Sequence, residues 1–220
     1  MSVGKRYKTN GSTFAVQTGF GSPKTVTNIT AAEPPVVSAA AHGFILGSVV
    51  KLANIDAPTQ LDDGTFAVDN PLTGTFELAG QDGTGYDAFD SGSPGATATP
   101  VTFSPFCELT SFNQQDGGAD QVEVTGWCST AKEFEQGLSD SGTLQLDYNL
   151  APNETVQTAI REAKLAGDKL AFKITFPGDG GMAIMIGTVQ QTSFQGAVNG
   201  VFTGSATIKL SGEVFVLEAA

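Results

Sequence analysis

The stretch from Ser141 to Phe176, SGTLQLDYNLAPNETVQTAIREAKLAGDKLAFKITF, decides the fold because two strand patterns flank one helix pattern. Residues 143–150 (TLQLDYNL) alternate apolar and polar side chains, as a half-buried strand does. Residues 170–176 (LAFKITF) carry a second apolar strand pattern. The segment therefore predicts a strand–helix–strand unit.

The helix is predicted over about residues 153–167. Asn153 is a favourable N-cap residue, and Gly167 supplies the left-handed residue that commonly ends a helix. One apolar stripe lies between them at helical spacing, formed by Val156, Ile160 and Ala163. We expect this stripe to pack on a sheet.

Further strand patterns surround this unit. They are CELTSF, QVEVT, MAIMIGTVQQ, TGSATIKLSG and EVFVLEA, with TFAVQ near the start of the chain. Two long polar segments, Asn113–Asp120 and Gly126–Ser141, are predicted as loops that are longer than most connections. The fold class is therefore mainly β, an antiparallel β-sandwich or barrel with one packed α-helix.

Residues 23–100 have a different sequence pattern from the rest of the chain. Short strand patterns (TVTNIT, VVSA, SVVKLANI, TFAVDN, TFELAG) are separated by Pro and Gly turns, and a flexible stretch, DSGSPGATATP, closes the segment. This spacing predicts a small all-β domain of barrel or sandwich type. The expected layout is a main domain of residues 1–22 and 101–220, with residues 23–100 inserted at an exposed turn.

The formal charge is −12, and it is unevenly distributed. Residues 1–22 hold three basic and no acidic residues, whereas residues 23–100 hold two basic and nine acidic, and residues 101–220 six and fourteen. A protein with this much negative charge is not expected to bind nucleic acid or anionic membranes tightly. Neither a secretion signal nor an apolar segment long enough to span a bilayer is seen, so we expect folding in a cytoplasm.

The C-terminal half resembles a known family. The segments CSTAKEFEQGLSDSGTLQLDYNLAPNETVQTAIREAKLAGDKLAFKITFPGDGG and GTVQQTSFQGAVNGVFTGSATIKLSG are similar to the major tail tube proteins of long-tailed, non-contractile, lambda-like bacteriophages (siphoviruses). The likeness covers roughly residues 102–218 and the start, MSVGKRYKTNG. Its combined features are the K-E-F-x-x-G-L segment, the SGTLQLDYN strand, the single helix and the closing TGSATIKLSG strand.

The inserted segment has a resemblance of its own. EPPVVSAAAHGFILGSVVKL, LDDGTFAVDN and GTFELAGQDGTGY are similar to small β domains of phage structural proteins. Those domains are described as similar to the first catalytic-cysteine half-domain (FCCH) of ubiquitin-activating enzymes. Both cysteines of this chain lie outside the insert, so thioester chemistry is not expected there.

The tail tube resemblance implies a structural virion protein. Such proteins close into hexameric rings, and the rings stack into the tube through which the genome leaves the particle. The implied partners are copies of the same chain, the tape measure, tail tip and tail terminator proteins, and DNA in non-specific passage. A negatively charged lumen would repel phosphate and let DNA slide.

Contacts between subunits are expected at two places. The first is the segment 126–141, where Lys132, Phe134, Gly137 and Leu138 are the predicted contact residues; the second is the N-terminal arm, with Arg6 and Lys8. No cofactor is implied, and assembly inside a host cell followed by residence in the virion tail is expected.

Catalytic alternatives are weak. His42, the single histidine, lies in an AHGF turn and has no second histidine or C-x-x-C pair with which to hold a metal. Cys107 and Cys128 are expected to be free thiols packed as small hydrophobic residues. Asp-Gly pairs in the insert are ordinary turns and do not form a calcium loop. The chain is therefore expected to be no enzyme.

Trp127 could anchor a loop or a core, or offer a platform for a sugar, and the first interpretation is preferred. An alternative function is a carbohydrate-binding or adhesion module with the insert as the binder. It requires exposed aromatic residues on the insert. The candidates alternate as core positions do: Phe44, Phe66, Phe76, Tyr86 and Phe89.

Overall fold

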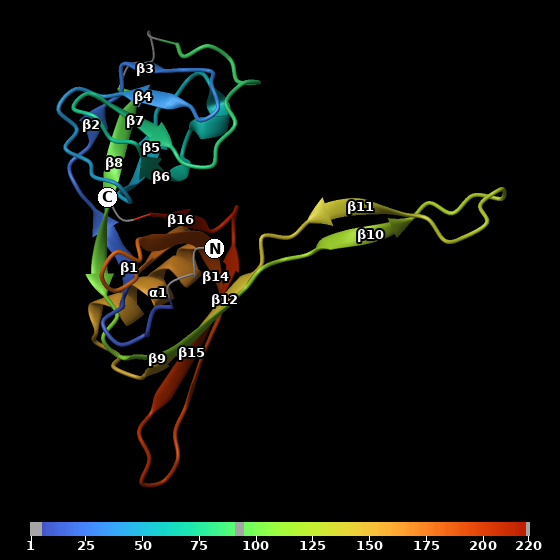
Figure 1. Ribbon diagram of the computed structural model, residues 1–220. Helices are drawn as coiled ribbons and strands as arrows, with labels where there is room; N and C mark the ends of the chain where they lie inside the picture. The colour runs from blue at the N-terminus through green and yellow to red at the C-terminus, as the bar shows by residue number, and fades with distance from the viewer. Residues whose placement is uncertain (1–5, 91–94, 219–220) are drawn as a thin grey trace.

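The computed structural model describes residues 6–90 and 95–218, and one antiparallel sheet dominates it (Figure 1). The sheet has fourteen strands, and its main path runs β3-β4-β7-β6-β5-β8-β1-β13-β14-β15-β12-β9. Two further strands lie off this path: β16 pairs with β14, and β2 pairs with β8. The described part of the chain contains one α-helix. The prediction of a mainly β fold with one helix is confirmed.

The first part of the path consists of short strands from the predicted insert. They are β2 (Lys24–Thr25), β3 (Asn28–Ile29), β4 (Val36–Ser38), β5 (Val49–Ala53), β6 (Thr65–Asp69) and β7 (Thr75–Leu78), with a short 3-10 turn η1 (Thr59–Leu61). Their inward side chains form a core of their own, including Val37, Leu52, Leu61, Val68 and Phe76. Each of these side chains is fully buried.

The rest of the path has longer strands. They are β1 (Thr13–Phe20), β13 (Lys169–Thr175), β14 (Met182–Gln195), β15 (Thr203–Leu210), β12 (Thr143–Asn149) and β9 (Leu109–Gln115). Alternation puts Leu144, Leu146 and Tyr148 of β12 on the buried face, opposite Ile208 and Ala206 of β15. The strands that the sequence predicted at 143–150 and 170–176 are therefore confirmed.

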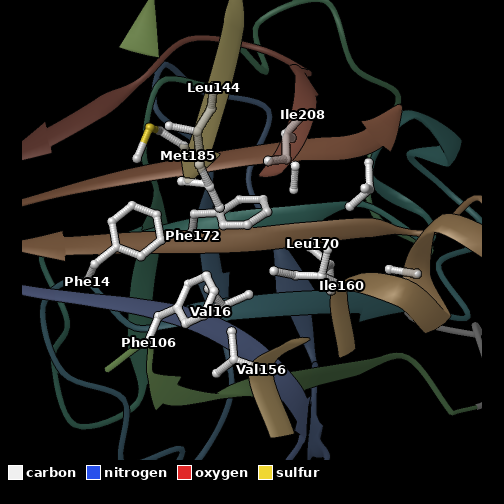
Figure 2. Packing of buried hydrophobic residues seen from close by; sticks show 14 of the residues in the cluster. Phe14, Val16, Phe106, Leu144, Val156, Ile160, Leu170, Phe172, Met185 and Ile208 are labelled. Carbon is white, nitrogen blue, oxygen red and sulfur yellow. The ribbon is translucent and has the colours of Figure 1, made fainter. Parts of the chain in front are cut away.

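The helix α1 (Thr155–Ala166) covers this face of the sheet. Val156, Ile160 and Ala163 pack into a cluster with side chains from the strands, as predicted. Figure 2 shows Ile160 and Val156 directed towards Leu170, Val16 and Phe172. Burying a large aliphatic side chain contributes roughly 1.5–3 kcal/mol, so this cluster holds the helix on the sheet.

The helix ends differ slightly from the expectation. The N-cap is Glu154, not Asn153, because the Glu154 carboxylate accepts a hydrogen bond of 2.9 Å from the Gln157 N–H. At the other end Gly167 has φ 76°, as expected for a left-handed cap, and donates to the Ala163 carbonyl. The buried Gln157 side chain also donates to the Asn149 carbonyl at 2.8 Å, which ties the helix to the end of β12.

The strand β8 (Thr97–Pro105) joins the two parts of the sheet. Its first residues pair with β5, from Thr97 opposite Ala53 to Pro100 opposite Val50. Its later residues pair with β1, from Val101 opposite Phe20 to Pro105 opposite Ala15. Residues 97–100 were expected to be flexible, and that prediction is wrong. The expected domain limit at 100/101 lies inside this strand.

A third hydrophobic cluster fills the junction between the insert and the longer strands. Val49, Ala67 and Ala79 of the insert pack with Ala171, Ile184 and Ile186 on the face of the sheet that the helix leaves free. The C-terminal strand β16 (Phe215–Leu217) adds Phe215 and Leu217 to the same cluster. We propose that residues 23–100 form a separate folding unit that is fixed against the main body.

Candidate assembly surface

A two-stranded ribbon projects from the body (Figure 1). It consists of β10 (Ala119–Glu123) and β11 (Phe134–Ser139), which pair with each other and form a sheet of their own. Glu123 lies opposite Phe134, and Val122 lies opposite Glu135. Residues 113–115, 119–120 and 134–139 of the two segments predicted as loops are strands, so the loop prediction is wrong there. Residues 126–133 form the turn that closes the ribbon.

The base of the ribbon is closely packed. An added Cβ at Gly117 would lie 1.9 Å from the Asp140 carbonyl oxygen, and one at Gly142 would lie 2.1 Å from the Gln115 carbonyl oxygen. Only glycine fits two backbones this close together. The Lys209 ammonium of β15 pairs with the Asp140 carboxylate, which also accepts from the Gly142 N–H at 2.8 Å. The hydrogen bonds from Lys209 and Gly142 lower the pKa of Asp140 below its ordinary value.

Of the four contact residues predicted in the second half of the chain, three lie on β11 of this ribbon, and Lys132 lies in the turn that closes it. Phe134 is 51% exposed and Leu138 is 87% exposed, while Gly137 faces Asp120 and Val122 across the ribbon. Lys132 forms an ion pair of 3.2 Å with Glu123, so it also fastens the two strands together. Large apolar side chains that meet no core of their own chain commonly mark an interaction surface.

The two predicted contact residues of the arm, Arg6 and Lys8, are exposed. Between them, Tyr7 packs against Phe176 with ring centroids 6.3 Å apart and donates a hydrogen bond to Asp179. The arm thus lies against the turn after β13, whereas the ribbon leaves from the end of β9 and returns to the start of β12. The structure does not bring the two sets of predicted residues into one patch within a single chain.

Three further surface features were not predicted from the sequence. Val122 and the fully exposed Trp127 add apolar surface to the ribbon. The hairpin of β14 and β15 extends beyond the body (Figure 1), and its end exposes Phe194, Val198, Val201 and Phe202. The outer side of β9 forms one edge of the main sheet. An open edge can pair with a strand of another chain. The exposed Trp127 and the uncharged run QQTSFQGAVNGVF were the available sequence signals.

Part of this chain is similar to known proteins. Residues 94–184, which include β9, the ribbon, β12, the helix and β13, match the model of the family described as "Phage tail tube, TTP, lambda-like". This region is related to phage tail tube proteins. The tail tube match begins at residue 94, so the resemblance proposed for the insert stays a prediction.

A curated relative agrees with the tail tube match. "Structural protein 3" of Pseudomonas phage PAJU2 is 28% identical over 136 residues, covering 52% of this chain and 82% of the relative. Two solved structures are also similar. The tail of an empty GTA particle with C6 symmetry has TM-score 0.43 and 16% identity over 52% of this chain and 86% of that one. The SPP1 tail tube has TM-score 0.42 and 12% identity over 50% and 66%. Both scores are low, and we draw no conclusion about assembly from these two structures.

The polar residues considered for chemistry have structural roles in this chain. His42 is buried: its Nδ1 accepts from the Phe44 N–H at 3.0 Å, and its Nε2–H donates to the Leu72 carbonyl at 2.7 Å. The ring thus has the neutral Nε2–H form and holds one turn of the insert. In the described residues, no group of three or more His, Cys, Asp or Glu side chains is placed to hold a metal ion.

Two sequence expectations are corrected. Cys107 and Cys128 are free, but both are exposed and do not pack as small hydrophobic residues. Trp127 anchors neither a loop nor a core of its own chain. Both errors have one physical cause: these residues lie on a ribbon and a turn that have no core of their own chain to cover them.

Within residues 6–90 and 95–218, no helix is long and apolar enough to cross a membrane.

Proposed function

We propose that this chain is a structural subunit of a phage tail tube. Copies assemble into stacked hexameric rings, and the tube they form is the conduit for genome ejection. The observation that carries the proposal is the projecting ribbon, whose apolar side chains (Val122, Trp127, Phe134, Leu138) meet no core of their own chain. The family match over the same residues supports it.

We place subunit contacts at Lys132, Phe134, Gly137 and Leu138 on the ribbon and at Arg6 and Lys8 in the arm. The outer edge of β9 is a second candidate, because strands of neighbouring copies can pair there through backbone hydrogen bonds. The acidic body supports a lumen that repels phosphate and lets DNA pass. The tape measure, tail tip and tail terminator proteins are the further partners of such a tube. In this proposal the protein assembles inside the host cell, resides in the virion tail and catalyses no reaction.

The alternative of a carbohydrate-binding insert has no support from the structure. Phe44, Phe66 and Phe76 lie in the core of the insert, and Tyr86 and Phe89 pack against that core half-buried. A sugar platform needs an exposed aromatic face, and these five residues do not provide one.

Negative-stain electron microscopy of the purified protein tests the proposal. We expect hollow tubes or stacked rings after concentration, with an elution volume that shifts towards large species. A protein that stays monomeric at high concentration, and also after addition of tail tips that carry the first ring, would contradict it.

A further inference from the structure

A groove of about 940 Å³ opens between the N-terminal arm and the start of β9. Its floor is aromatic: Phe14, Phe106 and Phe112 line it together with Phe176. The rings of Phe14 and Phe112 are 5.6 Å apart, and Phe112 remains 41% exposed. The groove is therefore an apolar surface that the chain itself leaves partly uncovered.

The rim of the groove carries a positive charge and a thiol. Among the described residues that line it, Lys8 is the single charged one, and Cys107, which is an exposed residue, also lines it. Arg6 lies on the same exposed N-terminal arm. This basic arm stands out on a protein whose formal charge is −12.

The tip of the ribbon has complementary properties. Residues 124–133 close the ribbon, and hydrogen bonds organise this turn: the Val124 N–H donates to the Glu133 carbonyl at 2.9 Å, and the Gly126 N–H donates to the Ser129 hydroxyl at 3.1 Å. The turn holds Trp127 and Cys128 on its surface, both exposed. The ribbon strands just behind the tip carry Asp120, Glu123 and Glu135, and the tip adds Glu133 and the single Lys132.

The tip is directed away from the groove of its own chain. The ribbon leaves the body between the end of β9 and the start of β12 (Figure 1), and the close backbone contacts of Gly117 and Gly142 fix its base. The ten steps from Gly117 to Trp127 span up to about 33 Å when extended, since a strand rises about 3.3 Å per residue. The tip is thus held far out from the body of its own chain.

We propose that Trp127 of one copy inserts into the aromatic groove of a second copy, with the acidic strands behind it beside Arg6 and Lys8. The inference rests on the proposed self-assembly and names one of its contacts. An indole is the largest apolar side chain, and buried Trp residues dominate many interfaces. The opposite charges of ribbon and arm offset the general repulsion between two acidic copies.

The contact is head-to-tail: each copy offers a tip and a groove, and the two lie on different parts of the molecule. Such a heterologous interface links copy to copy into a closed ring or an open filament. It also brings Cys128 of one copy near Cys107 of the next, because Cys128 adjoins Trp127 and Cys107 lines the groove. Two measurements test this contact between copies.

The first measurement uses the fluorescence of Trp127, the single tryptophan of the chain. We expect the emission maximum to move to shorter wavelength on assembly, and quenching by acrylamide to fall several-fold. Trp127→Ala should raise the concentration needed for assembly by a factor on the order of 30, as loss of a central interface tryptophan does. Leu72→Ala, which also removes an exposed apolar side chain, is the matched control and should change nothing.

The second measurement is thiol crosslinking of assembled protein with diamide, which oxidises two neighbouring thiols to a disulfide and is itself reduced. We expect a ladder of covalent trimers and larger species on a non-reducing gel. Cys107→Ser and Cys128→Ser should each abolish the ladder, because one half of every link is then missing. Reduction of the wild-type ladder should return monomers.

The outcomes separate the two proposals. Tubes in which Trp127 stays open to quencher, or in which crosslinking stops at dimers, would overturn the groove contact and leave the tube function standing; the β14–β15 hairpin would then be the next occupant to test. Absence of any association, at high concentration and with added tail tips, would overturn the tube function and the groove contact with it.

Discussion

Gly47 of the insert and Met182 of β14 approach so closely that a Cβ added at residue 47 would lie 1.8 Å from the methionine sulfur. Met182 belongs to the cluster at the junction of insert and body. Gly47 also has φ 72°, a conformation that L residues rarely adopt. The insert is therefore held against the body at a point that admits no side chain.

Gly47→Ala should destabilise the protein through this junction. We expect a loss of about 2–4 kcal/mol in the free energy of unfolding, from backbone strain and from displacement of Met182. Urea denaturation followed by circular dichroism measures it. Gly43→Ala is the matched control: Gly43 has φ 69°, but a Cβ there meets nothing within 4 Å. It should cost only the backbone term of about 1 kcal/mol. Equal losses in the two variants would refute the junction contact.

His42→Ala should weaken the insert. The change leaves the Phe44 N–H and the Leu72 carbonyl without their buried partner, and it opens space between the rings of Phe44 and Phe76. An unsatisfied buried polar group costs about 1–3 kcal/mol, so we expect a loss of about 2–4 kcal/mol. Lys51→Ala, which removes an exposed ion pair with Asp63, should cost less than about 1 kcal/mol. Thermal unfolding of both variants is the measurement, and equal melting temperatures would count against the role of His42.

Strands with one buried face could be predicted from the sequence, and strands without one could not. Residues 143–149 and 169–175 alternate because one side of each packs under the helix, and Gly167 marks the end of that helix by its conformation. The ribbon strands are exposed on both sides, so no alternation appears in ADQVE or FEQGLS. The polar composition of FEQGLS suggested a loop for that reason, whereas QVEVT was predicted as a strand and overlaps β10.

Long-range context explains the other differences. β8 contains Pro100 and Pro105, which weaken a strand pattern, yet it is held between β5 and β1, which are far from it in sequence. His42 was predicted to be a simple turn residue, but the two carbonyl partners of its Nε2 lie 30 and 33 residues away. In the candidate site, the contact residues predicted in the second half of the chain lie on the ribbon and its closing turn. The exposure of Trp127 and the presence of the groove could be recognised only from the three-dimensional structure.

The ion pair of Asp140 and Lys209 predicts a pH dependence at the base of the ribbon. The pKa of Asp140 is lower in the folded protein than the ordinary value of 3.8, chiefly because of the Lys209 hydrogen bond. The stabilisation is therefore fully present above about pH 3.8 and is lost as the pH falls through the lower folded pKa. Amide exchange of the 117–142 segment should be slower in wild type than in Asp140→Asn at pH 6. A difference that grows on acidification would contradict this linkage.

Phe134→Asp tests the ribbon as an assembly surface. Phe134 is half exposed on the ribbon and contributes nothing to the core clusters, so the variant should remain a folded monomer with an unchanged melting temperature. An aspartate there would have to be buried in a contact between copies, beside Glu123 on the paired strand. A buried unpaired charge costs several kcal/mol, so we expect no tubes at concentrations at which the wild type forms them. Ile45→Asp, at an exposed apolar residue of the insert, should still form tubes. Tubes of normal length from Phe134→Asp in negative stain would show that this face of the ribbon lies outside the subunit interface.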